Sequence, residues 1–281
     1  MQQYQQQTYD AERALYGIHD AQIIDCDFAG PADGESALKE TANLSVQNCR
    51  FYLRYPLWHV DKASILDSQM FETCRAPLWY DRDISVNHCE INGIKALRES
   101  AHVVIKDCEI VSPEFGWFCT DLSMTGCTLS SEYPFLKSRK MQFERLHMQA
   151  KYAFQYVENV TFQDCELNTK DAFWHSKNVT VTDSVVNGEY LGWYSENLHL
   201  VRCKIIGTQP LCYAKGLVLE DCEMEGADLA FEKSDVQANV RGKILSVKNP
   251  HSGCIVADEI GEVVQDADSQ TKDTVIQVRS K

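Results

Sequence analysis

Four dipeptides in the N-terminal half of the chain pair a basic or aromatic residue with a glutamate, histidine or tyrosine: Lys39–Glu40, Trp58–His59, Trp79–Tyr80 and Arg98–Glu99. Carboxylates and a histidine are groups that act as general acids and bases. Exposed aromatic rings stack on flat faces such as those of sugar rings. The two outer dipeptides lie in similar segments, ALKETAN (37–43) and ALRESAH (96–102), which indicates that the sequence repeats.

The repeat has a period of nineteen residues. It is marked by one recurring position, the anchor, which is occupied in turn by Cys89, Cys108, Cys127, Leu146, Cys165, Ser184, Cys203 and Cys222. Nearer the N-terminus the anchor is occupied by Cys26, Cys49 and Ser68, with small insertions between Cys26 and Cys49 and between Ser68 and Cys89. Apolar residues stand five and three positions before the anchor and two after it, and a fourth apolar column stands eleven before it. Because a spacing of two puts side chains on one face of a strand, each coil should contain three short strands.

This repeat predicts an all-β fold, a right-handed single-stranded parallel β-helix of about ten to twelve coils. A leucine-rich repeat is the alternative, since LHLVRCKI (198–205) fits its pattern, but the position eight before the anchor is mostly polar. We expect a single domain over 1–281. Within it, 1–20 should be an N-terminal cap with a short helix over 10–16, 21–235 regular coils, and 236–281 irregular coils and a second cap.

The four dipeptides fall at the positions ten and nine before the anchor. Since the position eleven before it is apolar, the position ten before it should face outward. The sequence therefore predicts an aromatic and charged ledge along one side, whose ligand-binding residues are Lys39, Trp58, Trp79, Tyr80, Arg98, Trp174, His175, Trp193 and Tyr194. Stacked aromatics that only stabilise the sheet are the alternative. Four loop residues could extend a site at the ledge: Asp33, Glu35, Arg54 and Arg75.

Glu40, His59 and Glu99 are the candidate catalytic residues. Glu40 and Glu99 are three coils apart, or ~14 Å, which exceeds the ~5–10 Å between the carboxylates of standard glycosidases. His59 is one coil from Glu40 and could be polarised by it as a general base. His175 lies about six coils from His59, so the two histidines cannot share a site. An ion-pair ladder at a sheet corner is the alternative without chemistry.

The anchor cysteines could form a disulfide or metal ladder, or could simply fit a crowded corner. Neighbouring anchors are ~4.8 Å apart with parallel Cβ directions, which is wider than a disulfide prefers. No cysteine or histidine spacing matches a zinc or iron–sulfur site. We therefore expect buried reduced thiols, no metal and no cofactor.

The formal charge of −14, from 41 acidic and 27 basic residues, argues against nucleic acid and anionic membrane surfaces as partners. No segment approaches the ~20 apolar residues of a membrane span, and the N-terminal segment lacks the features of a secretory signal. We therefore expect a cytoplasmic protein.

Seven segments are not dictated by the repeat: ERALYG (12–17), GPADGESALKE (30–40), LRYPLWHV (53–60), PEFGW (113–117), KDAFWHSKNVTV (171–181), GEYLGWYSENL (188–198) and GTQPLCY (208–213). They resemble an uncharacterised family of bacterial right-handed parallel β-helix proteins, a domain of unknown function whose architecture is similar to that of pectate-lyase-like β-helices. The resemblance implies the fold and an intracellular bacterial setting, and it lends no catalytic residues.

Two functions are consistent with these observations. The ledge could bind or act on an oligosaccharide or similar small molecule. Alternatively, the chain is a non-enzymatic scaffold whose ledge is a protein or self-association interface, so that it could form a homo-oligomer.

Overall fold

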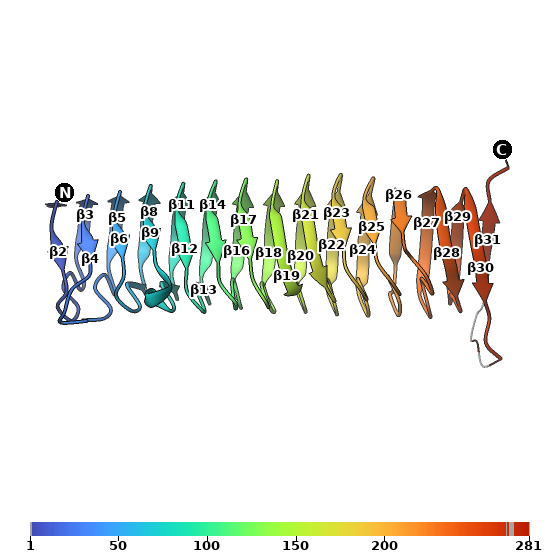
Figure 1. The fold of residues 1–281 in the computed structure, drawn as a ribbon, viewed down its shortest axis with the longest axis horizontal. Helices are drawn as coiled ribbons and strands as arrows, with labels where there is room; N and C mark the ends of the chain where they lie inside the picture. Colours follow the sequence, from blue (N-terminus) through green and yellow to red (C-terminus); the bar gives the residue numbers. More distant parts are fainter. Residues whose placement is uncertain (1, 268, 270–272, 281) are drawn as a thin grey trace. The chain divides into compact units, whose positions relative to one another are not determined.

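The computed structural model describes residues 2–267, 269 and 273–280, and the chain divides into two compact units, Met1–Met141 and Gln142–Lys281. Over the described residues the chain makes about 14 turns of an all-β parallel β-solenoid. The predicted fold class is confirmed, and the predicted number of coils is too small. Within each unit, strands of successive coils lie side by side and point the same way (Figure 1).

The first unit contains strands β1 (Gln2–Gln5), β2 (Thr8–Tyr9), β3 (His19–Ile24), β4 (Asp27–Phe28), β5 (Ala42–Gln47), β6 (Arg50–Phe51), β7 (Leu57–Trp58), β8 (Asp61–Leu66), β9 (Gln69–Met70), β10 (Leu78–Trp79), β11 (Arg82–Asn87), β12 (Glu90–Asn92), β13 (Leu97–Arg98), β14 (Ala101–Lys106), β15 (Glu109–Val111), β16 (Thr120–Thr125) and β17 (Thr128–Ser130). A 3₁₀ turn, η1 (Glu72–Cys74), interrupts the coil between β9 and β10. Strand β18 (Arg139–Glu144) includes the last residues of this unit.

The second unit contains β19 (His147–Tyr152), β20 (Glu158–Gln163), β21 (Glu166–Lys170), β22 (Lys177–Thr182), β23 (Val185–Asn187), β24 (Glu196–Val201), β25 (Lys204–Ile206), β26 (Leu217–Glu225), β27 (Asp235–Arg241), β28 (Lys243–Lys248), β29 (Ser252–Ala257), β30 (Glu259–Val264) and β31 (Thr274–Val278). Strands therefore continue through the segment 236–281 as far as Val278. They continue the parallel pairing, β27 with β29 and β29 with β31.

The nineteen-residue period sets the register of the strands. In the first unit Ile84 pairs with Val103 and Val103 with Leu122, each one period apart. All three side chains are buried, as are the residues two positions further along each strand. The residues that the alternation predicts to face inward thus form the core of the solenoid.

Each coil turns its corners with residues in the left-handed backbone region. One corner lies at the start of the long strand, where the second residue is left-handed, as at Asp83 in β11 and Asn178 in β22, with φ of 57° and 53°. Asparagine, aspartate and glycine tolerate this conformation better than other residues. A second left-handed corner directly precedes the anchor, as at Asp107, with φ of 50°. Left-handed residues other than glycine therefore form most corners of the nineteen-residue coil.

The third side of the coil differs from the prediction. Among the described residues it is a strand only at β7, β10 and β13, which form a small parallel sheet. Trp117 extends this sheet by an isolated bridge to Arg98, and in most other coils the corresponding segment is turn. Its residue nine before the anchor is in the left-handed region throughout, as at Glu40, His59 and Tyr80. A left-handed residue interrupts strand geometry, so this side remains short.

The predicted N-terminal helix over 10–16 is wrong. Residues 11–17 form turns, and their backbone N–H groups bond to the next coil, Arg13 N to Glu35 O and Leu15 N to Ala37 O at 3.0 and 2.9 Å. Alternate residues of this segment therefore donate their backbone N–H groups to the next coil. In a helix they would donate to the carbonyl four residues earlier in the same segment. The predicted cap at 1–20 includes a further coil, because β1 pairs with β3 and β2 with β4.

All twelve cysteines are free thiols, and every one except the half-buried Cys254 is buried. The prediction that the anchor cysteines are buried is confirmed. Several thiols donate to carbonyls of their own or the preceding coil, as Cys203 Sγ does to Val181 O at 3.2 Å. A small side chain with a weak donor fits a corner that is crowded by backbone.

Candidate functional site: a hollow beside β7 and β10

A hollow of about 440 Å³ opens on the third side of the first unit, beside β7 and β10. Its apolar lining comes from Tyr55, Trp58, Ala76, Trp79 and Ile94. Its polar lining comes from Arg13, Glu35, Ser36, Lys39, Arg75 and Lys95. We call this region the β10 hollow.

The two indoles of the β10 hollow are held rigidly. Trp58 and Trp79 occupy equivalent positions in β7 and β10, and their rings stack with centroids 5.1 Å apart and planes 5° apart. Each Nε1–H donates to a backbone carbonyl of the following coil, Trp58 to Ala76 at 2.7 Å and Trp79 to Lys95 at 2.9 Å. Both side chains remain half-buried, so part of each ring faces the hollow.

Arg98 covers the Trp79 ring from the next coil. Its guanidinium carbon lies 5.2 Å from the ring centroid of Trp79 and 5.1 Å from that of Trp117, as in a cation–π arrangement. Its Nε is 3.4 Å from Glu99 Oε1. Arg98 and Glu99 thus support the aromatic column from the side and do not line the hollow.

The loops around the β10 hollow come from coils that are longer than the repeat. The interval from Cys26 to Cys49 is 23 residues and that from Ser68 to Cys89 is 21. The first insertion contributes Glu35 and the second contributes η1 and Arg75. A Cβ on Gly34 would lie 2.2 Å from the carbonyl carbon of Ala11, so the first loop packs here only with a glycine.

The candidate catalytic residues have other partners. Tyr16 Oη donates to Glu40 Oε2 at 2.5 Å, and this hydrogen bond raises the pKa of Tyr16. The His59 ring stacks on the Tyr80 ring, with centroids 4.8 Å apart and planes 13° apart. Glu40 is therefore bound to the preceding coil and His59 to the following one. A catalytic role for Glu40, His59 and Glu99 stays a prediction.

The remaining predicted ligand-binding residues lie in the second unit: Trp174, His175, Trp193 and Tyr194. There His175 stacks between Tyr156 and Tyr194 at 5.1 and 4.9 Å, and Tyr194 stacks on Tyr213 at 4.8 Å. Rings in such a ladder cover one another's faces. Of the predicted binding residues, the β10 hollow brings together Lys39, Trp58 and Trp79.

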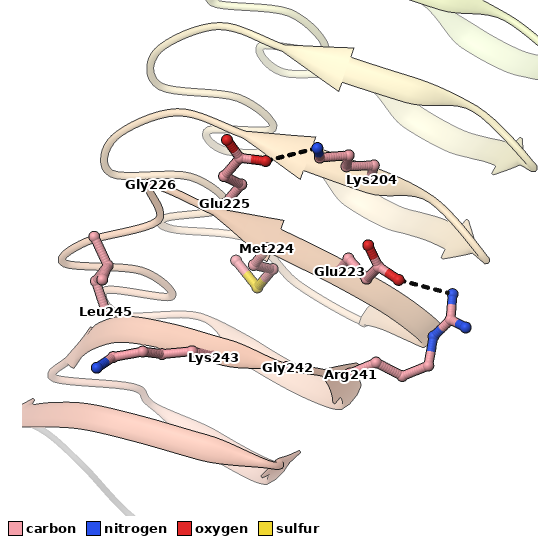
Figure 2. Close-up of a pocket in the computed structure, with 9 residues that line it drawn as sticks. All are labelled: Lys204, Glu223, Met224, Glu225, Gly226, Arg241, Gly242, Lys243 and Leu245. Atoms are coloured by element: carbon pink, nitrogen blue, oxygen red, sulfur yellow. Dashed lines mark ion pairs between the residues drawn. The ribbon is translucent and has the colours of Figure 1, made fainter.

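A second hollow of about 390 Å³, the β26 hollow, lies in the second unit between β26 and β28 (Figure 2). Three basic side chains line it, and each is paired. Lys204 Nζ is 2.6 Å from Glu225, Arg241 Nη2 is 3.4 Å from Glu223, and Lys243 Nζ is 2.6 Å from Glu259. Its lining contains no aromatic ring.

Sequence reasoning did not assign six lining residues to the β10 hollow, namely Arg13, Ser36, Tyr55, Ala76, Ile94 and Lys95. The signal that could have found the region is the pair of longer coil intervals. Residues inserted into a closely packed coil cannot enter the core, so they form a loop that projects from the surface. Such a loop can form one wall of a hollow.

Across the described part of the chain, no group of three or more histidine, cysteine, aspartate or glutamate side chains is placed to hold a metal ion. No helix among the residues that the structure places has the length and apolarity needed to cross a membrane.

Several solved structures resemble this chain at low similarity. PfbA, a surface adhesin of Streptococcus pneumoniae, is 10% identical over 92% of this chain and 74% of its own, with a TM-score of 0.37. Tailspike protein 3 of bacteriophage CBA120 is 10% identical over 99% of this chain and 55% of its own, with a TM-score of 0.36. The tailspike of the E. coli bacteriophage HK620, solved in complex with a hexasaccharide, is 9% identical over 92% and 59%, also with a TM-score of 0.36.

No protein with a curated description matches the chain significantly. A family model described as protein of unknown function (DUF3737) matches residues 2–278, almost the whole chain. The chain therefore belongs to the DUF3737 family.

Proposed function

We propose that the chain binds a carbohydrate-like ligand in the β10 hollow. The observation that carries this proposal is the pair of stacked indoles, Trp58 and Trp79, in the wall of a hollow large enough for a small saccharide. Binding sites for small molecules are concave, with aromatic walls and a few placed polar groups. Tyr55 adds a third ring, tilted 41° to Trp58 at 4.8 Å.

The geometry of the hollow supports a binding site more than a catalytic site. The indoles are fixed by stacking and by hydrogen bonds to Ala76 O and Lys95 O, so a ligand meets a preformed wall. Preorganisation lowers the entropy lost on binding. The candidate catalytic residues are engaged outside the lining, so turnover of the bound sugar is a separate hypothesis.

A cytoplasmic location remains part of the proposal.

Calorimetric titration with a panel of neutral and acidic oligosaccharides tests the proposal. We expect one panel member to bind the parent chain and Trp79→Ala to abolish its binding. Trp193→Ala is the matched control, because Trp193 Nε1 donates to Gln209 O at 2.8 Å in the same manner, but the residue lines neither hollow. Thermal melts of both variants separate lost binding from lost folding.

The scaffold hypothesis gives the opposite pattern. If no glycan binds the parent chain, and Trp79→Ala instead lowers the solution mass of an oligomer, the ledge is an interface and the carbohydrate proposal fails.

A further inference from the structure

We infer that the ligand of the β10 hollow is anionic, a saccharide that carries carboxylate or phosphate groups. This inference rests on the proposed function and adds the charge of the ligand. Four basic side chains and one acidic side chain line the hollow: Arg13, Lys39, Arg75, Lys95 and Glu35. The chain as a whole carries a net charge of −14, so the charge of this lining is opposite in sign to that of the whole protein.

Part of this positive charge is neutralised by neighbouring acids. Arg13 Nε lies 3.7 Å from Glu12, and Lys95 Nζ lies 3.5 Å from Glu114. The acidic residue of the lining, Glu35, is itself held by Arg54 at 3.3 Å. Arg54 also pairs with Asp33 at 2.9 Å, outside the hollow.

Lys39 and Arg75 are the two basic side chains of the lining that remain uncompensated. Neither forms an ion pair with any acidic group that the structure describes within 4.0 Å. Lys39 is half-buried beside an aromatic wall, where a charge interacts more strongly than it does in bulk water. An anion placed between these side chains would therefore gain charge-assisted hydrogen bonds without first breaking ion pairs.

The two uncompensated charges lie on the coils before and after that of Trp58. Lys39 is one coil before Trp58, since Leu38 N and Glu40 N bond to Pro56 O and Trp58 O. Arg75 directly precedes Ala76, whose carbonyl accepts the Trp58 Nε1–H at 2.7 Å. Adjacent coils are ~4.8 Å apart, so a sugar ring against Trp58 would have a basic group on either side.

The β26 hollow shows that unpaired basic groups are not a general property of hollows in this chain. It is of similar volume, and its three basic side chains are all paired with glutamates. Figure 2 shows two of these ion pairs, Lys204 with Glu225 and Arg241 with Glu223. A ligand anion there would have to displace a carboxylate. The unpaired positive charge therefore distinguishes the β10 hollow from the β26 hollow.

Matched pairs of probes test the charge. Trigalacturonate is compared with maltotriose for the carboxylate, and glucose 6-phosphate with glucose for the phosphate, each by calorimetry at low and high sodium chloride. We expect the charged member of at least one pair to bind about tenfold tighter or more, with an affinity that falls as salt rises. The pair that responds identifies the anionic group.

Variants then locate the effect. Lys39→Gln and Arg75→Gln should each weaken the charged probe about tenfold, and Lys39→Arg should retain most of the affinity. Lys204→Gln in the β26 hollow is the control and should leave binding unchanged. These side chains are not in the core, so the variants should fold, and circular dichroism verifies this.

Three results would overturn the inference in distinguishable ways. If neutral and charged probes bind equally and salt has no effect, the ligand is a neutral sugar and the proposed function survives. If inorganic phosphate alone binds as tightly as glucose 6-phosphate, the hollow is a simple anion site without a sugar contact. If no probe binds at all, the proposed function fails together with the inference.

Discussion

Trp58 and Trp79 stack in register on adjacent coils, with ring planes 5° apart and centroids 5.1 Å apart. The same contact that makes them a wall of the β10 hollow also covers one face of each ring. Arg98 lies over Trp79 at 5.2 Å, from the side of the next coil. A ligand therefore meets the exposed parts of a fixed aromatic column, and structural and binding roles must be separated by experiment.

Two changes at Trp58 separate the contributions of its hydrogen bond and of its ring stack to stability. Trp58→Phe removes the hydrogen bond to Ala76 O but retains part of the stack, so we expect a loss of about 1–2 kcal/mol in the free energy of unfolding. Trp58→Ala removes both and should cost about 2–4 kcal/mol. Urea titration monitored by circular dichroism measures both losses. Equal losses in the two variants would show that the stack contributes nothing to stability.

A second prediction concerns the left-handed corners. Asn178 has φ of 53°, donates to Asn159 Oδ1 at 3.1 Å and accepts from Asn197 Nδ2 at 2.9 Å. Asn178→Ala loses both side-chain hydrogen bonds. It also places alanine in the left-handed conformation, which costs about 1–2 kcal/mol for the backbone alone. Asn178→Gly loses the same bonds without that backbone cost.

We therefore expect Asn178→Gly to melt at a higher temperature than Asn178→Ala, although glycine is usually the more destabilising residue. Asn178→Val should be worse than either, since a β-branched side chain fits this region least. Thermal melts of the three variants give the order, and a glycine variant less stable than the alanine variant would contradict the role of the corner.

The sequence predicts the coil well because one constraint recurs in every period. Residues such as Val103 and Ile105 alternate inward at a spacing of two, and a nineteen-residue return puts each above its equivalent. The helix over 10–16 was wrong because local propensity competes with pairing between coils. Arg13 N and Leu15 N find acceptors in the next coil, and that pairing continues the sheet.

The candidate site was predictable only in part. Lys39, Trp58 and Trp79 stand in the repeat, so the period places them on one side of the coil. Arg75 and Arg13 reach the hollow from segments outside the repeat, one following a 3₁₀ turn and one in the first coil. Insertion loops take their conformation from contacts such as that of Gly34 with Ala11, and no periodicity encodes those contacts.

A third prediction concerns the thiols. Cys254 is half-buried and the other eleven cysteines are buried. Burial raises the pKa of Cys49 to about 12, so its reactive thiolate is scarce at neutral pH as well as shielded. A maleimide reagent should label Cys254 alone in the native protein and all twelve thiols in denaturant. Cys254→Ser should abolish native labelling, whereas rapid labelling of several thiols in that variant would contradict the packing.

The last prediction concerns Asp81, a fully buried carboxyl inside the first unit. Its Oδ1 accepts a hydrogen bond from Val60 N at 2.9 Å, and its Oδ2 has no hydrogen-bond partner among the described atoms. Burial raises the pKa of Asp81 well above its ordinary value, and the bond from Val60 opposes this only in part. The carboxyl is therefore neutral in the folded chain at pH values where the unfolded chain, with a pKa of about 3.9, is ionised.

A raised pKa in the folded state means that the folded chain binds more protons than the unfolded chain between the two pKa values. The free energy of unfolding should therefore fall as the pH rises from about 4 toward the folded pKa of Asp81. Serine occupies the equivalent position one coil later, where Ser100 Oγ accepts from Asp81 N at 3.1 Å. Asp81→Ser should thus keep an acceptor for Val60 N and remove the buried carboxyl. We expect this variant to be more stable than the parent chain at pH 8, with the difference shrinking toward pH 4. Urea unfolding of both proteins at the two pH values measures the difference, and a gap that stays constant between them would show that Asp81 does not titrate between the folded and unfolded states as its burial requires.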